Sequence, residues 1–447
     1  MSSFIPTSVE SILSRLTQHG YKAYLVGGCV RDYIAGIPPH DFDVTTSATP
    51  DKILAVFHDV KTVPTGISHG TVTVIMNNTS VEVTTFRCDG DYSDHRRPDS
   101  VTFSTEYRDD AARRDFTMNA IAYNNEEGIV DPFGGAEDIK QGIIRAVGDP
   151  YKRFDEDALR ILRAVRFASV LGFEIESNTS NAIHELCHLL SGVSAERISS
   201  ELTKLLCGKN VVKVLTEYSD VISTVIPEIT PMIGFCQHNP HHIYDVWEHT
   251  VHTVDSIKPV PYLRLAALFH DVGKPSTFSI QADGLGHFYG HSAAGCTIAE
   301  GIIKRLKLPN DIRDKVLTII RYHDLQIPAE KSSVMKFMRR HGSDALTDLI
   351  EMFKADNLAL SPEFHSRQQH YDRLAEFMQE ILNEDACFSI KHLAVNGNDL
   401  IALGVKEGKQ IGTLLNLLLD KVIASQLPNS RDALLEYVAT HLNGESR

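Results

Sequence analysis

The sequence predicts an α/β region at the start of the chain followed by an all-α remainder. Helical stretches separate short β-rich runs, which occur only early in the chain, at 22–28, 41–46, 71–76, 81–86 and 143–147. From Phe154 onward, apolar residues recur at helical spacing, and breaks containing Pro or Gly divide the helices. The pattern therefore favours a head of sheet and helices joined to a helical body.

The length of the chain predicts several domains. At 447 residues, it is longer than one hydrophobic core normally organises. Changes in period and composition place the expected boundaries near residues 150, 235 and 365. The expected regions are an α/β head at 1–150, a helical neck at 151–235, a helical domain at 236–365 and a helical tail at 366–447.

The composition excludes several classes of protein. With 43% hydrophobic and 23% charged residues, the chain lies in the ordinary globular range, which excludes disordered and collagen-like proteins. The net charge of -14 has the wrong sign for coating nucleic acid, so a polyanionic partner needs a local basic patch. Seven scattered cysteines, the lack of a long apolar run and a start unlike a signal peptide predict a soluble cytoplasmic protein with no membrane partner.

A strand, a Gly-Gly turn, a helix and a second strand follow one another in YLVGGCVRDYIAGIPPHDFDVTT. Gly27 and Gly28 leave backbone N–H groups open to a triphosphate, and Arg31 lies nearby in the helix. Asp41 and Asp43 are two apart in the expected strand, so their carboxylates point to one face. Such oxygen ligands suit Mg²⁺. Two solvated acids on an edge strand are the alternative, but the preceding Gly-Gly turn favours the metal.

Glu82 is a third candidate acid for the same site. It lies in the run VEVTTF, where its apolar neighbours face the opposite side of the expected strand. A shared metal site requires this arrangement, and a solvated edge acid is the alternative.

Five ordered motifs identify a family resemblance. GGCVRDYIAG, HDFDVTT, RRDFTMNAIAY, DPFGG and EDALRILRAVRFA together resemble the class II CCA-adding tRNA nucleotidyltransferases and the bacterial poly(A) polymerases. The resemblance implies a polymerase-β-like nucleotidyltransferase head in which Asp41 and Asp43 hold two Mg²⁺ ions. One ion would activate the primer 3′-hydroxyl and the other would neutralise the leaving pyrophosphate.

The last of these motifs contains a candidate base selector. Asp157 and Arg160 are three residues apart on one expected helix face, and Arg163 and Arg166 continue the row. The pair offers an acceptor beside a donor, which matches the amino group and ring nitrogen of cytosine or adenine. Uracil and guanine would turn a carbonyl toward the carboxylate. The resemblance gives Asp157 and Arg160 this role and implies triphosphate contacts for Arg114, Arg163 and Arg166. A helix face held by ion pairs is the alternative.

A polar segment, RCDGDYSDHRRPDSVTF, follows the run that contains Glu82. Its Gly, Pro and charged residues predict a mobile loop. In the resembling family, a loop at this place is associated with the switch from C to A addition, so it favours complete CCA synthesis. An ordinary surface loop is the alternative.

A second set of candidate ligands lies in YDVWEHTVHTV, LFHDVGKPSTF, GHSAAG, RYHDLQ and FKADNLAL. A His-Asp pair inside an apolar helix is costly to bury unless it binds something, and mixed imidazole and carboxylate ligands suit Mn, Fe, Co or Ni. The order of these His and Asp residues along the chain resembles that of the HD-domain phosphohydrolases, and Lys274 is placed to meet phosphate. This resemblance implies a metal set of His249, His270, Asp271, His291, His323 and Asp356.

The alternative for any one of these histidines is a hydrogen-bonded role without metal. The histidines of QHNPHH, which are His238, His241 and His242, are assigned to a polar turn rather than to the metal set.

The sequence therefore predicts a template-independent enzyme that uses CTP and ATP to complete or repair the 3′ CCA end of tRNA, with an HD phosphodiesterase or phosphatase on the same chain. The tail at 366–447 is expected to bind tRNA. The rivals are a poly(A) polymerase, an HD phosphohydrolase with a head that only binds RNA, and a non-catalytic RNA-binding protein. The oligomeric state, the HD metal and the HD substrate stay open.

Overall fold

The computed structural model describes residues 5–90, 92, 100–240, 242–282, 284–384, 389–405, 408–424 and 426–444. The chain forms two compact units, which we describe separately: Met1–Pro227 with Arg305–Lys307, and Glu228–Lys304 with Leu308–Arg447. The finer division into four regions stays a prediction.

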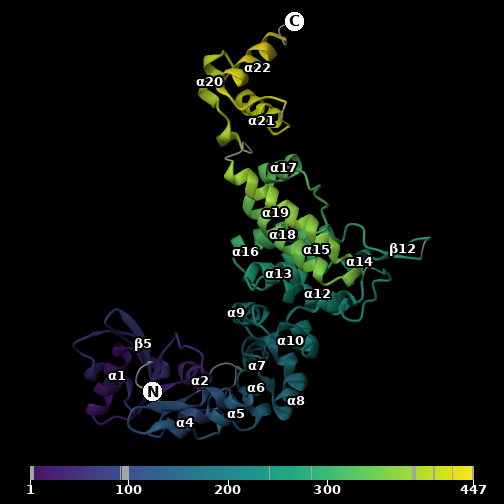
Figure 1. Ribbon diagram of the computed structural model, residues 1–447. Helices are drawn as coiled ribbons and strands as arrows, with labels where there is room; N and C mark the ends of the chain where they lie inside the picture. The colour runs from purple at the N-terminus through teal and green to yellow at the C-terminus, as the bar shows by residue number, and fades with distance from the viewer. Residues whose placement is uncertain are drawn as a thin grey trace. The chain divides into compact units, whose positions relative to one another are not determined.

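The first unit is built on a seven-stranded mixed sheet (Figure 1). All neighbouring strands are antiparallel except the parallel pair β2–β5. In spatial order the strands are β3 (Lys61–Gly66), β4 (Thr71–Met76), β5 (Thr79–Thr85), β2 (Asp43–Thr46), β1 (Ala23–Val26), β8 (Ala122–Asn124) and β9 (Gly128–Val130). The α/β head predicted from the sequence is confirmed by this mixed sheet.

The predicted strands correspond only in part to the observed ones. The runs at 22–28, 41–46 and 71–76 contain β1, β2 and β4, and the run at 81–86 overlaps β5, which begins two residues earlier. The run at 143–147 was wrongly expected to be a full strand. It holds only β10 (Ile143–Ile144), which pairs with β11 (Glu174–Ile175) outside the main sheet. Three sheet strands had no sequence signal, because β8 and β9 are very short and β3 contains both a Pro and a Gly.

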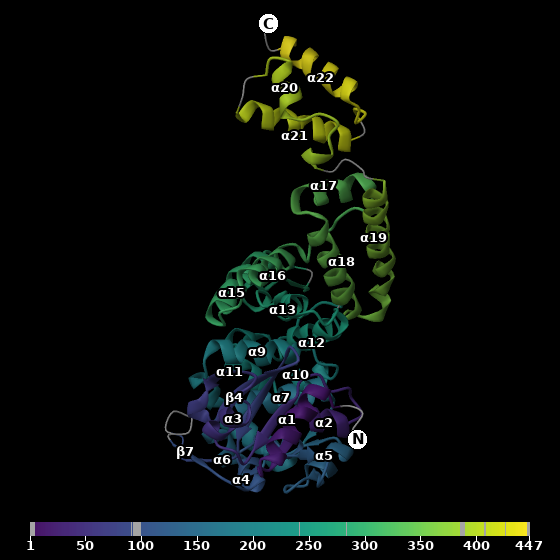
Figure 2. The ribbon, with the colours of Figure 1, turned by 90° about the vertical axis from the view of Figure 1, so that its left-hand side faces the viewer.

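Eleven helices flank or follow this sheet in the described part of the first unit. They are α1 (Thr7–Gln18), α2 (Gly28–Ile34), α3 (Pro50–Val56), α4 (Tyr107–Ala112), α5 (Gly135–Gln141), α6 (Pro150–Glu156), α7 (Leu159–Leu171), α8 (Ser177–Leu186), α9 (Ala195–Leu206), α10 (Val211–Glu217) and α11 (Ser219–Val225). Helices α7 and α9 pack against each other, as Figure 2 shows. The packing follows from sequence, since α9 buries Ile198, Leu202 and Leu205 on one face.

The polar segment after β5 begins and ends in a short hairpin. Strand β6 (Arg87–Asp89) pairs with β7 (Val101–Phe103). The middle of the expected mobile loop lies outside the described residues, so that expectation stays a prediction.

The second unit is mostly helical, as the sequence predicted. Its helices are α12 (Val246–Ser256), α13 (Pro261–Phe269), α14 (Lys274–Thr277), α15 (His291–Arg305), α16 (Asn310–Tyr322), α17 (Lys331–His341), α18 (Ser343–Leu358), α19 (Gln368–Asn383), α20 (Gly397–Ala402), α21 (Lys409–Ile423) and α22 (Arg431–Gly444). A small hairpin joins β12 (Ser279–Ile280) to β13 (Gly286–His287).

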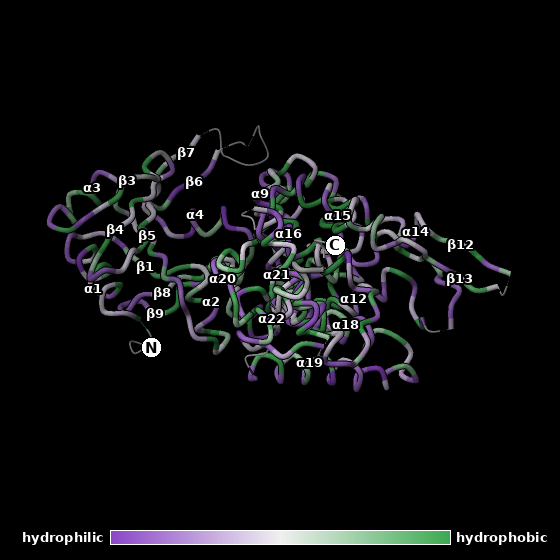
Figure 3. Tube along the Cα trace, turned by 90° about the horizontal axis from the view of Figure 1, so that it is seen from above, coloured by the Kyte–Doolittle hydropathy of each residue, from purple (hydrophilic) through white to green (hydrophobic). Residues whose placement is uncertain are grey.

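Amphipathic packing holds the second unit together. Polar and apolar positions alternate along α19 in Figure 3, and its buried residues are Leu374, Met378 and Ile381. Helices α20 to α22 enclose a separate apolar cluster that includes Leu418 and Leu434. Across the described residues, every helix is too short or too polar to cross a bilayer.

Candidate active site

The parallel pairing of β2 and β5 brings two candidate acids together. Val44 lies level with Val83, and Asp43 and Glu82 each precede one of these buried valines. The two carboxylates therefore leave neighbouring strands on the same, exposed face. Asp41 lies just before β2 instead of within it, so the expectation that one strand carries both aspartates was wrong.

The three acids affect one another electrostatically. Loss of solvent around Asp43, repulsion from Glu82 and a smaller repulsion from Asp41 raise the pKa of the Asp43 carboxyl, while Arg114 acts against the rise. A divalent cation would relieve this repulsion, and carboxylate oxygens are the ligands that Mg²⁺ prefers. Within the described ranges, three or more ligand atoms lie within 4.8 Å of one another only in the second unit, so these acids do not form a closed cage.

The Gly-Gly turn lies beside an arginine from a different part of the chain. Gly27 has φ +77° and precedes α2, a conformation that favours glycine. A Cβ at Gly27 would lie 3.5 Å from Nη1 of Arg114. Arg114 is held from behind, because its Nη2 donates to Oδ2 of the fully buried Asp110 at 3.0 Å. The turn and Arg114 therefore form one surface, as the predicted triphosphate site needs.

Asp115 connects this surface to α7. Its carboxylate accepts hydrogen bonds from Arg163 Nη2 at 2.6 Å, Arg163 Nε at 2.9 Å and Asn119 Nδ2 at 3.0 Å. Although burial opposes ionisation, Arg163 and Asn119 hold the pKa of Asp115 well below its usual range. Asn119 Oδ1 in turn accepts from Arg31 Nη1 at 2.9 Å. Asp115 is therefore an architectural acid that fixes two of the arginines.

Three guanidinium groups surround the ring of Phe167. Their carbon atoms lie 5.0 Å (Arg31), 5.5 Å (Arg163) and 3.5 Å (Arg166) from the ring centroid. Glu201 on α9 compensates part of this charge, since its carboxylate lies 2.8 Å from Arg166 Nε and 3.6 Å from Arg163 Nη1. Arg31 also pairs with Asp32 at 2.7 Å, and Arg163 pairs with Asp115, so each guanidinium group has an acidic partner. The cluster therefore gathers oriented guanidinium donors in one place, while the neighbouring acids balance most of its charge.

The candidate base selector differs from the expected helix row. Helix α6 ends at Glu156, and Asp157 is extended (φ -143°, ψ 100°), so it does not share a helix face with Arg160. The expectation was wrong because i,i+3 geometry requires a continuous helix, and the chain breaks between α6 and α7. Asp157 Oδ2 accepts instead from Arg197 Nη2 at 2.7 Å.

Arg160 is buried and its donors are already occupied. Nη1 donates to Glu156 Oε2 at 2.9 Å and to the Arg153 carbonyl at 3.0 Å, and Nη2 donates to the Arg113 carbonyl at 2.9 Å. Reading a base therefore requires Arg160 to exchange at least one of these bonds. Arg197 and Glu201, which contact the selector and the arginine cluster, were not found from the sequence because both act across a helix pair.

The second unit brings all six predicted metal ligands together. Two groups have their ligand atoms within 4.8 Å of one another: His249 with His270 and Asp271, and Asp271 with His291 and His323. Asp356 joins them through a 2.8 Å contact between its Oδ1 and His249 Nε2. These residues come from α12, α15, α18 and the ends of α13 and α16.

The four imidazoles share one orientation. The Nδ1 atoms contact backbone carbonyl oxygens at 3.3 Å for His249, 2.7 Å for His270, 2.8 Å for His291 and 2.7 Å for His323. A carbonyl only accepts, so each Nδ1 carries a hydrogen and each neutral ring has its lone pair on Nε2. The Nε2 atoms of His291 and His323 lie 3.0 Å apart. Two lone pairs at that distance need a proton or a metal ion between them, and hydrogen-bonded Nδ1 atoms are typical of metal ligands.

The charges in this cluster also favour a cation. Although burial opposes charging, Asp271 and Asp356 raise the pKa of His270 to about 10. A cavity of about 880 Å³ opens beside the ligands, and Lys274, Arg367 and Tyr371 are among the residues that line it. Lys274 Nζ lies 2.7 Å from Asp271 Oδ2 and donates to Gln237 Oε1 at 2.8 Å. The residues present therefore fit a divalent cation next to a space for a ligand.

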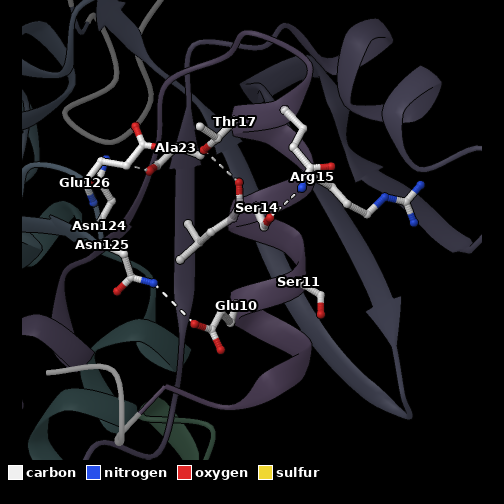
Figure 4. A pocket seen from close by; sticks show the side chains of 11 residues that line it. Glu10, Ser11, Ser14, Arg15, Thr17, Ala23, Asn124, Asn125 and Glu126 are labelled. Carbon is white, nitrogen blue, oxygen red and sulfur yellow. Dashed lines mark hydrogen bonds between the residues drawn. The ribbon is translucent and has the colours of Figure 1, made fainter.

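Another recess, of about 740 Å³, lies between α1 and the β8–β9 turn. Figure 4 shows its polar lining, where Asn125 Nδ2 donates to Glu10 Oε1 at 3.4 Å. None of the predicted site residues lines this recess, so it takes no part in the sites above.

Comparisons with known protein families agree with the two-part architecture. The model described as "Poly A polymerase head domain" matches residues 23–145, and "Probable RNA and SrmB- binding site of polymerase A" matches 172–231. A third model, "tRNA nucleotidyltransferase domain 2 putative", matches 294–438. The head and its arginine-rich surface thus define a nucleotidyltransferase.

Individual relatives specify the family. The chain is 34% identical over 428 residues to a CCA-adding enzyme of Ligilactobacillus salivarius, covering 95% of this chain and 94% of the relative. It is 52% identical over 205 residues to a CCA-adding enzyme of Anoxybacillus flavithermus, which covers 46% of this chain and 51% of the relative. The chain belongs to the family of CCA-adding enzymes.

Solved structures agree in fold. The CCA-adding enzyme of Bacillus stearothermophilus in complex with CTP superposes with a TM-score of 0.73 at 29% identity, covering 98% of both chains. The Thermotoga maritima CCA-adding enzyme complexed with tRNA has a TM-score of 0.61 at 20% identity, covering 99% of this chain and 97% of that one, and supports the fold alone.

Proposed function

We propose that this chain completes and repairs the 3′-terminal CCA of tRNA, using CTP and ATP without a nucleic-acid template and releasing pyrophosphate. The observation that carries the proposal is the pairing of β2 with β5, which sets Asp43 and Glu82 on one exposed face of the sheet. Arg114 is close enough to act electrostatically on Asp43. Relatives have been solved with CTP, with ATP and with tRNA. A cytoplasmic location is part of the proposal.

The acids would hold Mg²⁺, with Asp41 and Asp43 as the main ligands and Glu82 as the third acid. When bound, the metal lowers the pKa of the primer 3′-hydroxyl and neutralises the leaving pyrophosphate. The carboxylates themselves place negative charge on one face of the sheet and orient whatever cation they bind.

The arginines would bind the triphosphate. Arg163 and Arg166 are fixed by Asp115 and Glu201, so their guanidinium groups are oriented before the nucleotide arrives. Arg114 is oriented by Asp110 in the same way. Preoriented donors avoid the entropy cost of ordering flexible side chains on binding.

Asp157 and Arg160 would select the base. The Asp157 carboxylate accepts from the amino group of cytosine or adenine, and Arg160 donates to the adjacent ring nitrogen after exchanging one of its carbonyl partners. Uracil or guanine would set a carbonyl against the carboxylate, which costs about 1–3 kcal/mol. Base choice would thus be a property of protein side chains.

The test uses three tRNA transcripts, which end before CC, before A, or with the complete CCA, together with labelled CTP or ATP. We expect growth up to CCA and then a stop. A long ladder of A residues would instead support the rival poly(A) polymerase. Asp43→Asn is the control that assigns catalysis to this site. If the variant no longer adds nucleotides, the head is catalytic, which excludes a head that only binds RNA.

We also propose a second activity, metal-dependent hydrolysis of a phosphoester, for example a 2′,3′-cyclic phosphate at a damaged tRNA end. The observation that favours it is the convergence of four Nε2 atoms and two carboxylates. The set would hold Mn, Fe, Co or Ni, which supplies an activated water when bound. Lys274 and Arg367 line the adjacent cavity and would bind phosphate oxygens.

The double variant His270→Ala with Asp271→Ala tests this second activity. We expect it to lose phosphodiesterase turnover and bound transition metal, measured by elemental analysis, while CMP and AMP addition continues. Equal loss of both activities would make the histidine cluster a structural element of the transferase.

A further inference from the structure

The partner of Asp157 lies forty positions further along the chain. Arg197 is in the first turn of α9, and its Nη2 donates to Asp157 Oδ2 at 2.7 Å. The side chains are 25% and 16% exposed, so water only partly screens the pair. Asp157 Oδ1 accepts from the Leu159 amide at 3.2 Å. Both oxygens therefore have fixed neighbours, and only one of those neighbours is a side chain.

Asp157 depends on such a neighbour because no helix fixes it. It is extended between α6 and α7, directly after Glu156, the last residue of α6. A carboxylate at such a junction has free rotamers unless a tertiary contact restricts them. Arg160 does not supply that contact, since its three bonds go to Glu156 and to two backbone carbonyls.

The position of Arg197 is itself secured by α9. The helix packs on α7 through Ile198, Leu202 and Leu205, and Glu201 contacts Arg166 one turn further along. The loss of the Arg197 guanidinium would leave this apolar face and the Glu201 contacts in place. A variant at Arg197 should therefore fold and still bind a triphosphate.

We propose that Arg197 is a positioning residue for base selection, which holds the Asp157 carboxylate in the orientation that accepts the amino group of cytosine or adenine. The inference rests on the proposed role of Asp157. Arg197 acts through Asp157 and does not touch the base. A merely structural residue on α9 would affect all four nucleotides equally, whereas a positioning residue changes their ratio.

The experiment measures kcat/KM for single incorporation of CTP, ATP, UTP and GTP into tRNA by the full chain. Arg197→Ala should reduce the preference for CTP over UTP by about tenfold, and Arg197→Lys should restore part of it, because lysine returns one donor without the planar fork. Glu196→Gln is the matched control: it breaks the exposed contact between Glu196 and Lys307 at the adjacent position of α9 and should leave the preference unchanged.

Asp157→Ala and the double variant Asp157→Ala with Arg197→Ala complete the design. We expect this double variant to show the same preference for CTP over UTP as Asp157→Ala alone, since the two residues act as one unit. If Asp157→Ala relaxes the preference and Arg197→Ala does not, or lowers all four rates equally, the role of Arg197 is refuted while base selection by Asp157 stands. If Asp157→Ala leaves the preference intact, base selection by Asp157 and the role of Arg197 both fall, although CCA addition does not.

Discussion

Binding of a divalent metal should stabilise the second unit and leave the first unit unchanged. The perturbation is removal of metal by a chelator, followed by addition of Mn²⁺. The structure gives the reason: the Nε2 atoms of His291 and His323 lie 3.0 Å apart, next to the carboxylate of the buried Asp271. A metal ion would bind both lone pairs and the carboxylate at once, in place of a proton shared by the two rings.

The size of the effect follows from mass action. At a free Mn²⁺ concentration of about 100 times Kd, binding to the folded state alone adds about 2.7 kcal/mol to the free energy of unfolding. For a unit of roughly 200 residues, each kcal/mol raises Tm by about 2–4 °C. The expected rise is therefore about 5–10 °C.

The chain contains its own probe for this measurement. Its single tryptophan, Trp247, is 3% exposed on α12, two positions before His249. Tryptophan fluorescence therefore reports the unfolding of the second unit and not of the first. His323→Ala should abolish the shift. His252→Ala on the same helix is the control, because His252 stacks on Tyr244 and belongs to neither ligand group.

A fluorescence transition that stays at the same temperature from chelated protein to millimolar Mn²⁺, Ni²⁺ and Co²⁺ would refute the metal site. A shift that persists in His323→Ala would show binding elsewhere. In either case the four histidines would have to be explained by shared protons alone.

Three further predictions concern the first unit. Asp43→Asn should lower nucleotide addition about a thousandfold or more with an unchanged circular dichroism spectrum, because a metal at this position stabilises several kcal/mol of transition-state charge; a tenfold loss would contradict its role as a ligand. Asp115→Asn should lower the free energy of unfolding of the first unit by about 2–3 kcal/mol. This is less than the loss of a fully buried ion pair would cost, because the Arg163 side chain is 32% exposed. The urea dependence of hydrogen exchange in peptides of the first unit measures the change. Because the folded-state pKa of Asp115 is depressed, this difference is present above pH 4 or so and shrinks as the pH falls further, and a difference that grew in acid would contradict the assignment. Gly27→Ala should lower the free energy of unfolding by about 1–3 kcal/mol, because φ +77° with ψ -131° is a backbone conformation that residues with a Cβ rarely adopt. It should also raise KM for CTP and ATP alike, since the new methyl group lies against Arg114, and steady-state kinetics with a changed CTP-to-ATP ratio would argue against this.

The acids of the head illustrate what a pattern can reveal. The alternation in VEVTTF puts Glu82 on the face opposite Val81 and Val83, and the structure has the same arrangement. The order of the motifs also predicted the family, which the relatives confirm. These features depend on residue type and on spacings within one element, and both can be read along the chain.

The base selector illustrates where a pattern fails. The spacing of Asp157 and Arg160 is that of a helix, yet the chain breaks at Asp157. The local sequence does not indicate that break, because Ala158 and Leu159 are good helix formers. The two short strands β8 and β9 were missed for a related reason: β8 is stabilised by pairing with β1, and β9 by pairing with β8, while their own sequences carry little strand signal.

By itself, the sequence determined the two kinds of architecture, the identity of the acids, arginines and histidines, and their order along the chain. It could do so because periodicity and residue chemistry act over a few positions. Only the tertiary structure decided that Arg197 pairs with Asp157, that Glu201 compensates the arginine cluster, and that four imidazoles turn Nε2 toward one another. Those contacts depend on how separate helices pack, and packing is a property of the whole fold.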